Sequence, residues 1–260
     1  MSLWDALILG IVQGATEFLP VSSSGHLVIV QALLDVTLTG VLFEIAVHVA
    51  TLVSILLVYR ARVGKLAHGV VARDADAVRY VMLLAVATIP AGIVGLLWKD
   101  QIEGLFDNPA TPGFALLITG AFLWSSRAAL ARAVNERPGW AAAFLIGVAQ
   151  AFALVPGISR SGSTVVAALW LGINAREAAA FSFLMAIPVI AGAAVLQLGD
   201  LDMAGLGVGP LVVGGLAAAV TGVLAIRTLV ALLARESFHL FAPYCWAVGA
   251  GFLLYLRYGR

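Results

Sequence analysis

The sequence has very little charge. Only 11% of its 260 residues are charged, whereas an ordinary soluble domain carries about 25%. The 15 lysines and arginines nearly balance the 14 aspartates and glutamates, so no positive excess points to a nucleic acid or another polyanion as partner. Because 62% of the positions are hydrophobic, the chain cannot form a water-soluble surface, and an ordinary soluble protein is excluded.

Cysteine is nearly absent as well. The single cysteine, Cys245, lies within an apolar run, which excludes an intramolecular disulfide framework and a metal site built on cysteine ligands. No basic residue precedes the first apolar stretch, and Gln13 and Glu17 interrupt that stretch early. We therefore expect the chain to keep its start and to have no cleaved signal peptide.

The sequence is rich in long apolar runs instead. A bilayer core about 30 Å thick needs roughly 20 apolar residues for each helical crossing. Runs bounded by charge, glycine or proline predict six full transmembrane helices, over residues 41–59, 80–98, 113–124 or 113–130, 178–198, 211–233 and 240–258. The predicted fold is an all-α polytopic membrane protein, with a single integral membrane domain over residues 1–260.

Two further stretches, residues 3–34 and 140–171, are apolar at both ends but polar in the middle. Their centres, FLPVSSSGH and LVPGISRSGST, contain proline and glycine that interrupt a continuous helix. Lipid cannot satisfy backbone N–H and C=O groups that leave a helix at membrane depth, so such backbone must be buried in protein or line a wet cavity. Both stretches are predicted to be re-entrant helix-loop-helix hairpins.

Basic residues set the predicted orientation. Eleven of the 15 lysines and arginines fall in segments 60–79, 127–139, 174–177 and 227–239, and such segments belong on the cytoplasmic side. The loops 98–112 and 199–210 carry acidic residues and only Lys99, so they are expected outside, with both termini. Three crossings separate the two hairpins, which must then enter from opposite sides and can meet in the middle of the membrane.

A short internal repeat supports this topology. A shift of 137 positions superposes Gly10 on Gly147, Gln13 on Gln150, Ser22 on Ser159, Ser24 on Ser161 and Gly25 on Gly162. We expect two repeats of inverted topology, about residues 1–125 and 140–260. Many transporters have this architecture, with their site at the repeat interface, and the same layout can serve an intramembrane enzyme.

The two hairpin tips carry reactive polar groups. Gln13 and Glu17 are four residues apart, on one face of a helix, and three serines and His26 follow the helix-breaking Pro20. On the second tip, Arg160 is the only cation outside the flanking loops and chain ends, and three serines and a threonine surround it. A planar guanidinium among hydroxyls and the N–H groups of a helix start predicts a phosphate-sized anion site.

Structural roles compete with these chemical ones. Serine and glutamine in membrane helices often only pack or bond neighbouring helices, and Arg160 can be a structural partner of Glu17. Glu44 and His48, also four residues apart, fit site support and an interfacial pair equally well.

The segments GIVQGATEFLPVSSSGH and LVPGISRSGST, in this order, closely resemble the two signature segments of the bacterial undecaprenyl-diphosphatase family of the bacitracin-resistance type. FEIAVHVATL and AAAFSFLMAIP resemble that family's accompanying segments, so the resemblance spans most of the chain. It implies hydrolysis of the C55 polyprenyl diphosphate to the monophosphate at the periplasmic or outer face of the plasma (inner) membrane. That reaction recycles the carrier lipid for cell-wall synthesis and gives bacitracin resistance.

The resemblance also implies site residues. The family's acidic motif falls on Gln13 and Glu17, where this chain has the glutamine variant, and the serine-histidine and arginine segments fall on residues 22–26 and 159–164. We predict Ser23 as nucleophile, His26 as general base and Arg160 as the grip on the diphosphate. The predicted substrate-binding residues are Gln13, Ser22, Ser24, Ser159, Ser161, Gly162 and Thr164.

Two further roles stay open at this level. Glu17 either orients His26 or holds a divalent cation, Mg²⁺ or Ca²⁺, which can also arrive on the substrate. Water activated by His26 and Glu17 is the alternative nucleophile. The expected partners are the polyprenyl diphosphate lipid and the bilayer, without nucleic acid, and a homodimer is compatible with the sequence.

Two other functions compete with a phosphatase. A transporter or flippase of a phosphorylated polyprenyl lipid follows from the inverted repeat alone, but transport has no evident use for adjacent Glu, Ser and His groups. An intramembrane serine protease would use Ser and His at membrane depth, but an arginine among hydroxyls suits phosphate better than a peptide carbonyl.

Overall fold

The computed structural model describes residues 1–34, 36, 42–196 and 207–259, and these residues form helices without any strand. The first half contains α1 (Leu3–Phe18), α2 (Ser23–Leu34), α3 (Leu42–Val58), α4 (Arg60–Val71), α5 (Ala75–Leu97), α6 (Lys99–Phe106) and α7 (Ala110–Leu130). The second half contains α8 (Trp140–Phe152), α9 (Arg160–Trp170), α10 (Ala175–Leu196), α11 (Val208–Ala234), the short 3₁₀ helix η2 (Phe238–Leu240) and α12 (Phe241–Tyr258). The predicted all-α fold is confirmed.

Helices stand at all six predicted crossings. Five segments, namely α5, α7, α10, α11 and η2 with α12, are long and apolar enough to span a membrane. α3 is slightly shorter, with 17 residues, and bends by 83° into α4. α7 runs to Leu130, the longer of the two predicted ends. Position 41, positions 197–198 and most of the predicted outer loop 199–210 lie outside the described residues.

Two segments predicted as loops are helical. α4 lies within the basic segment 60–79, which also contains the start of α5, and α6 lies within the acidic loop 98–112. Both helices mix charged and apolar residues, which is typical of amphipathic helices at a surface. Their charge content shows that these segments lie outside the apolar runs. It does not show whether they are loops or helices.

Both interrupted stretches are helix-loop-helix hairpins, as predicted. α1 ends before Pro20, and the turn passes through Ser22 in a left-handed conformation, with φ of 67°. α8 ends at Phe152, and its turn passes through Gly157 at φ of 98°. The tips of the two hairpins touch, because a Cβ built on Gly25 would lie 2.9 Å from the Cα atom of Gly157.

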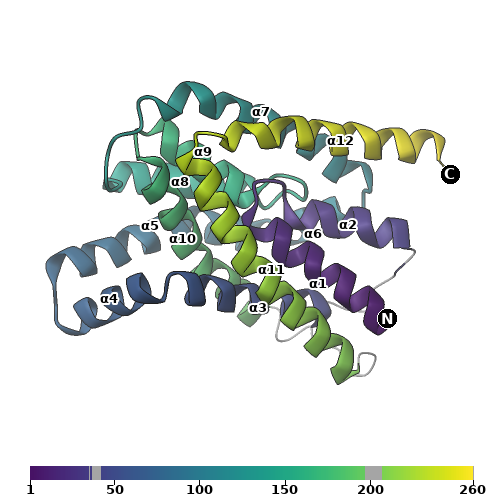
Figure 1. Cartoon of the computed structure of the whole chain (residues 1–260), viewed down its shortest axis with the longest axis horizontal. Helices are drawn as coiled ribbons and strands as arrows, with labels where there is room; N and C mark the ends of the chain where they lie inside the picture. Colours follow the sequence, from purple (N-terminus) through teal and green to yellow (C-terminus); the bar gives the residue numbers. More distant parts are fainter. Residues whose placement is uncertain (35, 37–41, 197–206, 260) are drawn as a thin grey trace.

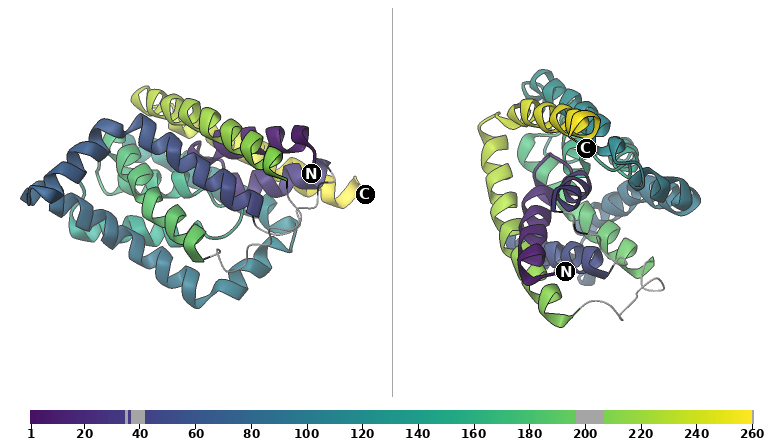
Figure 2. Two further views of the ribbon diagram at one scale, coloured as in Figure 1. Left: turned by 90° about the horizontal axis from the view of Figure 1, so that it is seen from below. Right: turned by 90° about the vertical axis from the view of Figure 1, so that its right-hand side faces the viewer.

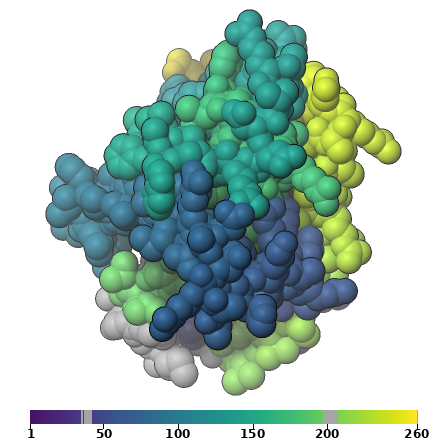
Figure 3. Space-filling view, turned by 90° about the vertical axis from the view of Figure 1, so that its left-hand side faces the viewer, coloured from purple at the N-terminus to yellow at the C-terminus, as the bar shows by residue number. Residues whose placement is uncertain are grey.

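The basic segments gather at one end of the bundle. Arg62 pairs with Glu177 at 2.7 Å, and Arg137 pairs with Asp76 at 3.1 Å. Both termini lie at the opposite end (Figures 1 and 2), and Figure 3 views the basic end face-on. This separation agrees with the topology expected from the basic residues, and the assignment of the basic end to the cytoplasm stays a prediction.

Each hairpin is anchored by a close helix crossing through a glycine. A side chain on Gly10 of α1 would collide with the carbonyl of Gly214 in α11, and one on Gly147 of α8 would collide with the carbonyl of Ala87 in α5. Small residues at such crossings let helix backbones approach closely in a membrane. The internal repeat superposes Gly10 on Gly147, so both copies use the same position for a close crossing. The predicted limits of the two repeats stay a prediction.

The Gly147→Ala variant is expected to lower the stability of the protein by about 1–3 kcal/mol, the typical cost of an overpacked site. The measurement is the thermal midpoint of the protein purified in detergent. Gly92→Ala is the matched control, because a Cβ at Gly92 of α5 meets nothing within 4 Å and alanine favours a helix by about 0.5–1 kcal/mol over glycine. Equal midpoints for the two variants would contradict the close crossing.

Candidate active site

A pocket of about 320 Å³ opens where the two hairpin tips meet. Its polar lining comes from three places: the first hairpin contributes Thr16, Glu17 and the serines 22–24, the second contributes Ser159 and Arg160, and α3 contributes Glu44 and His48. Its apolar lining comes mainly from α10 and the end of α8. The sequence-predicted convergence of the two tips is therefore present.

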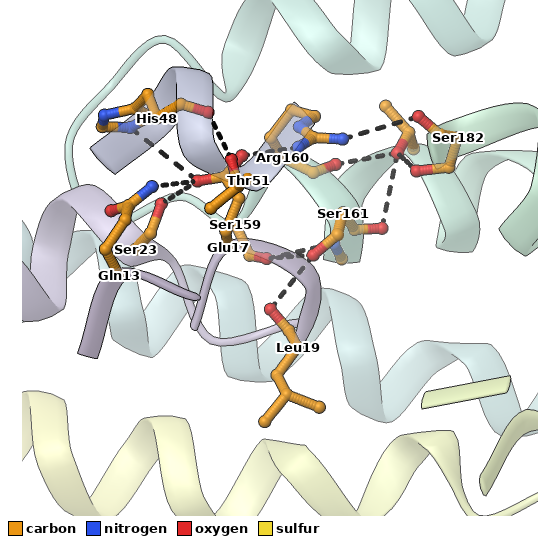
Figure 4. A network of polar contacts seen from close by, with 12 residues as sticks. Gln13, Glu17, Leu19, Ser23, His48, Thr51, Ser159, Arg160, Ser161 and Ser182 are labelled. Carbon is orange, nitrogen blue, oxygen red and sulfur yellow. Dashed lines mark hydrogen bonds and ion pairs between the residues drawn. The ribbon is translucent and has the colours of Figure 1, made fainter. Parts of the chain in front are cut away.

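Glu17 is the centre of the polar cluster. Its Oε1 atom accepts a hydrogen bond from Nη2 of Arg160 at 2.6 Å, and its Oε2 atom accepts one from the Ser23 hydroxyl at 2.6 Å. The amide of Gln13 donates to Oε2 as well, at 2.9 Å. Figure 4 shows these side chains pointing toward one another from both hairpins. A carboxylate that is only 8% exposed is thus matched by a cation and two neutral donors.

The second tip is built to present Arg160. Ser159 caps α9, because its hydroxyl accepts a hydrogen bond from the N–H of Gly162 at 3.0 Å. The hydroxyl of Thr119 in α7 accepts from the N–H of Ser159 at 3.1 Å and donates to the carbonyl of Gly157 at 2.9 Å. Arg160 is the first residue of the capped helix, so the cap fixes the backbone position from which its side chain extends.

The first tip is built to present Ser23. Ser22 adopts the left-handed conformation, and its hydroxyl accepts from the N–H of Gly25 at 3.3 Å. Ser23 then begins α2 and is only half-buried, and its side chain faces Glu17. The hydroxyls of Ser22 and Ser24 lie 3.3 Å apart, and all three serines line the pocket.

Four of the predicted substrate-binding residues do not line the pocket. The Ser161 hydroxyl donates to the carbonyl of Leu19 at 3.1 Å, which ties the two tips together. The Thr164 hydroxyl donates to the carbonyl of Arg160 at 2.8 Å and lies 2.6 Å from the Ser182 hydroxyl. Gln13 is fully buried behind Glu17, and Gly162 supports the cap of α9. These residues hold the site together, and a direct contact of theirs with substrate stays a prediction.

His26 is turned away from Glu17. Its Nδ1 atom lies 2.9 Å from the carbonyl of Ser22, and its Nε2 atom lies 2.9 Å from the hydroxyl of Tyr244 on α12. It is not among the residues that line the pocket. His48 of α3 does line the pocket, and its Nε2 atom is 3.8 Å from Oε2 of Glu17. The predicted role of His26 as general base stays a prediction, and the geometry offers His48 for the same chemistry.

The described residues do not form a ready cage for a divalent cation. No group of three or more His, Cys, Asp or Glu side chains converges among them. Both oxygens of Glu17, the predicted ligand, are occupied by Arg160, Ser23 and Gln13. Gln13, the first position of the acidic motif, has an amide side chain that adds no negative charge. These residues therefore do not fit a resident Mg²⁺ or Ca²⁺.

Comparisons with known proteins agree with this arrangement. The family model "Bacitracin resistance protein BacA" matches residues 6–251. Three similar proteins are each named undecaprenyl-diphosphatase. That of Desulfatibacillum aliphaticivorans is 39% identical, covering 96% of this chain and 97% of its own length. That of Rubrobacter xylanophilus is 42% identical, covering 96% and 97%, and that of Desulfosudis oleivorans is 41% identical, covering 94% and 95%.

Proposed function

The chain belongs to the family of the bacitracin resistance protein BacA, and from this premise we propose that its intramembrane pocket hydrolyses undecaprenyl diphosphate to undecaprenyl phosphate and phosphate. We further propose that the pocket opens to the periplasmic or outer side of the bacterial inner membrane, where the reaction recycles the carrier lipid for cell-wall synthesis and gives bacitracin resistance. One observation carries the assignment of the site: Ser23 and Arg160, from opposite hairpins, meet on the two oxygens of Glu17.

Arg160 is the group that grips the diphosphate. A guanidinium has five N–H donors, and the bond to Glu17 uses one of its terminal nitrogens while the other lies 3.5 Å from the carbonyl of Ser182. The side chain is 14% exposed, at the pocket wall. Partial burial strengthens its attraction for phosphate oxygens, because water screens the charge less than at an open surface.

Ser23 is the nucleophile. Its oxygen forms a bond to the terminal phosphorus, the bond from that phosphorus to the bridging oxygen breaks, and undecaprenyl phosphate leaves. The serine proton passes to Oε2 of Glu17, which already accepts the hydrogen bond at 2.6 Å. Phosphoryl transfer asks mainly for positioning and for neutralisation of the transferring group, and the fixed turn at Ser22 and the guanidinium of Arg160 supply these two requirements.

The prenyl tail lies against the apolar side of the pocket. Val189, Ile190, Ala193 and Ala194 of α10 line that side. Of these residues Ala193 is exposed at the surface of α10, where the bilayer supplies the same apolar environment as the tail. The headgroup can therefore stay among the hydroxyls while the chain remains in lipid.

The assay that tests the function uses the purified protein in detergent with undecaprenyl diphosphate. Release of orthophosphate and formation of undecaprenyl monophosphate are expected. A transporter of the same lipid would move the substrate across a liposome membrane without releasing phosphate, so intact diphosphate after prolonged incubation would contradict the enzyme.

A divalent cation, Mg²⁺ or Ca²⁺, is proposed to enter with the diphosphate rather than to reside in the protein. Diphosphate oxygens bind such ions well, whereas the described residues offer no converging ligand set. We therefore expect Mg²⁺ to leave the thermal midpoint of the ligand-free protein unchanged and to raise it only together with a non-hydrolysable diphosphate lipid. Saturable Mg²⁺ binding to the ligand-free protein, measured by calorimetry, would contradict this proposal.

A further inference from the structure

His48 approaches the reacting groups from outside both hairpins. It lies on α3, lines the pocket, and its side chain is 32% exposed. Its Nε2 atom is 3.8 Å from Oε2 of Glu17, the oxygen that also accepts the Ser23 hydroxyl. The imidazole and the serine oxygen therefore stand on the same side of one carboxylate (Figure 4).

The backbone of α3 fixes which nitrogen of His48 is available. Nδ1 lies 2.7 Å from the carbonyl oxygen of Glu44, and a carbonyl oxygen can only accept, so Nδ1 carries the hydrogen. In the neutral ring, Nε2 then has the free lone pair. That lone pair is on the nitrogen nearest Glu17, where a base for the reaction is needed.

His26 has the same Nδ1 arrangement but a different environment at Nε2. Its Nδ1 donates to the carbonyl of Ser22 for the same reason, which leaves Nε2 to accept from the Tyr244 hydroxyl at 2.9 Å. The two rings are also stacked, with centroids 5.7 Å apart. Its ring therefore connects the left-handed turn at Ser22 to Tyr244 of α12, and its Nε2 lone pair is already engaged.

We propose that His48 is the general base of the second chemical step, in which water hydrolyses phosphorylated Ser23. This inference rests on the proposed function. Water forms a bond to the serine-bound phosphorus and gives a proton to Nε2 of His48. The bond from phosphorus to the Ser23 oxygen breaks, and that oxygen takes back the proton held by Glu17. Orthophosphate leaves, and His48 returns its proton to solvent through the open pocket.

The division between Glu17 and His48 follows from their contacts. Glu17 is already hydrogen-bonded to Ser23 and is the nearest acceptor for the serine proton. After the first step Glu17 is protonated and cannot take a second proton, so the water step needs a separate base. The imidazole of His48, with its side chain 32% exposed, lies beside it and can serve as that base.

The test is rapid acid quench of the full-length protein with substrate labelled in its terminal phosphate. His48→Gln is expected to form undecaprenyl phosphate in a burst equal to the amount of enzyme and to accumulate label on Ser23. Its steady-state phosphate release should fall about 10²–10⁴-fold, the typical contribution of a general base. His68→Gln is the matched control, because His68 is an exposed residue of α4 that does not line the pocket, and its activity should match wild type.

Three results would overturn the proposal. They are slow turnover of His48→Gln with neither burst nor label, turnover of His48→Gln equal to wild type, and accumulation of label in His26→Gln instead. If His48→Gln does not fold, as judged by its thermal midpoint, His48→Asn and imidazole rescue of His48→Ala provide the same readout. A wild-type protein that releases no phosphate would reject the proposed function itself, which separates that failure from failure of the inference.

Discussion

The Arg160→Gln variant is expected to lose about 10³–10⁵-fold in kcat, the range found when an arginine that stabilises a phosphoryl transition state is removed. The guanidinium reaches Glu17 from the second tip, at 2.6 Å. Without it, the pocket contains two carboxylates, Glu17 and Glu44, and little to offset the charge of a diphosphate. Phosphate release by the purified variant is the measurement.

This variant also has a structural cost, which must be separated from the catalytic one. Removing one partner of a buried ion pair typically costs about 3–5 kcal/mol, because the other charge is left without compensation. The double variant Glu17→Gln/Arg160→Gln removes both charges and is expected to recover much of the thermal midpoint. Its activity should stay at or below the level of the single variant, because Glu17 is also the acceptor of the Ser23 proton. If activity returns together with stability, Arg160 is a structural partner of Glu17 and not the phosphate grip.

Much of this fold follows from apolar length alone. The six crossings are visible because lipid demands long apolar runs, and the two hairpins are visible because proline and serine interrupt such runs. Counting three crossings between them was enough to bring Glu17 and Arg160 together, and the 2.6 Å bond agrees with that topology. The sequence could not show that α4 and α6 are helical, because short amphipathic segments carry no membrane signal.

The assignment of roles among the polar residues was harder to predict. His26 is adjacent in sequence to the reactive serines, yet Tyr244, more than two hundred residues away, takes its outer nitrogen. His48 belongs to a different helix and reaches the site only through the packing of α3 on the hairpins. Likewise Ser161 and Thr164 share a tip with Arg160, but the helical turn of α9 points them at protein groups. Proximity along the chain does not determine which way a side chain faces.

The Ser23→Ala variant distinguishes a serine nucleophile from direct attack by water. If Ser23 attacks phosphorus, its removal should lower kcat by about 10⁴-fold or more, since loss of a serine nucleophile can cost about 10⁶-fold in kcat. If water attacks directly, the variant loses only a hydrogen bond to a charged group. Such a bond contributes about 1.5–3 kcal/mol, which corresponds to roughly 10–150-fold. The two mechanisms therefore predict effects that differ by about two orders of magnitude.

The control for this substitution is Ser125→Ala on α7. Ser125 bonds Trp170 at 3.1 Å and does not line the pocket, so its removal should leave phosphate release near the wild-type rate. Phosphate release by Ser23→Cys is a second readout. A thiol keeps a nucleophile at the same position but has a different acidity from a hydroxyl. A fall of only about tenfold in Ser23→Ala, with single-step inversion at phosphorus, would assign the attack to water. In that mechanism Ser23 serves only to hold the carboxylate of Glu17, through the hydrogen bond at 2.6 Å. Glu17 is then the group that accepts the proton of the attacking water.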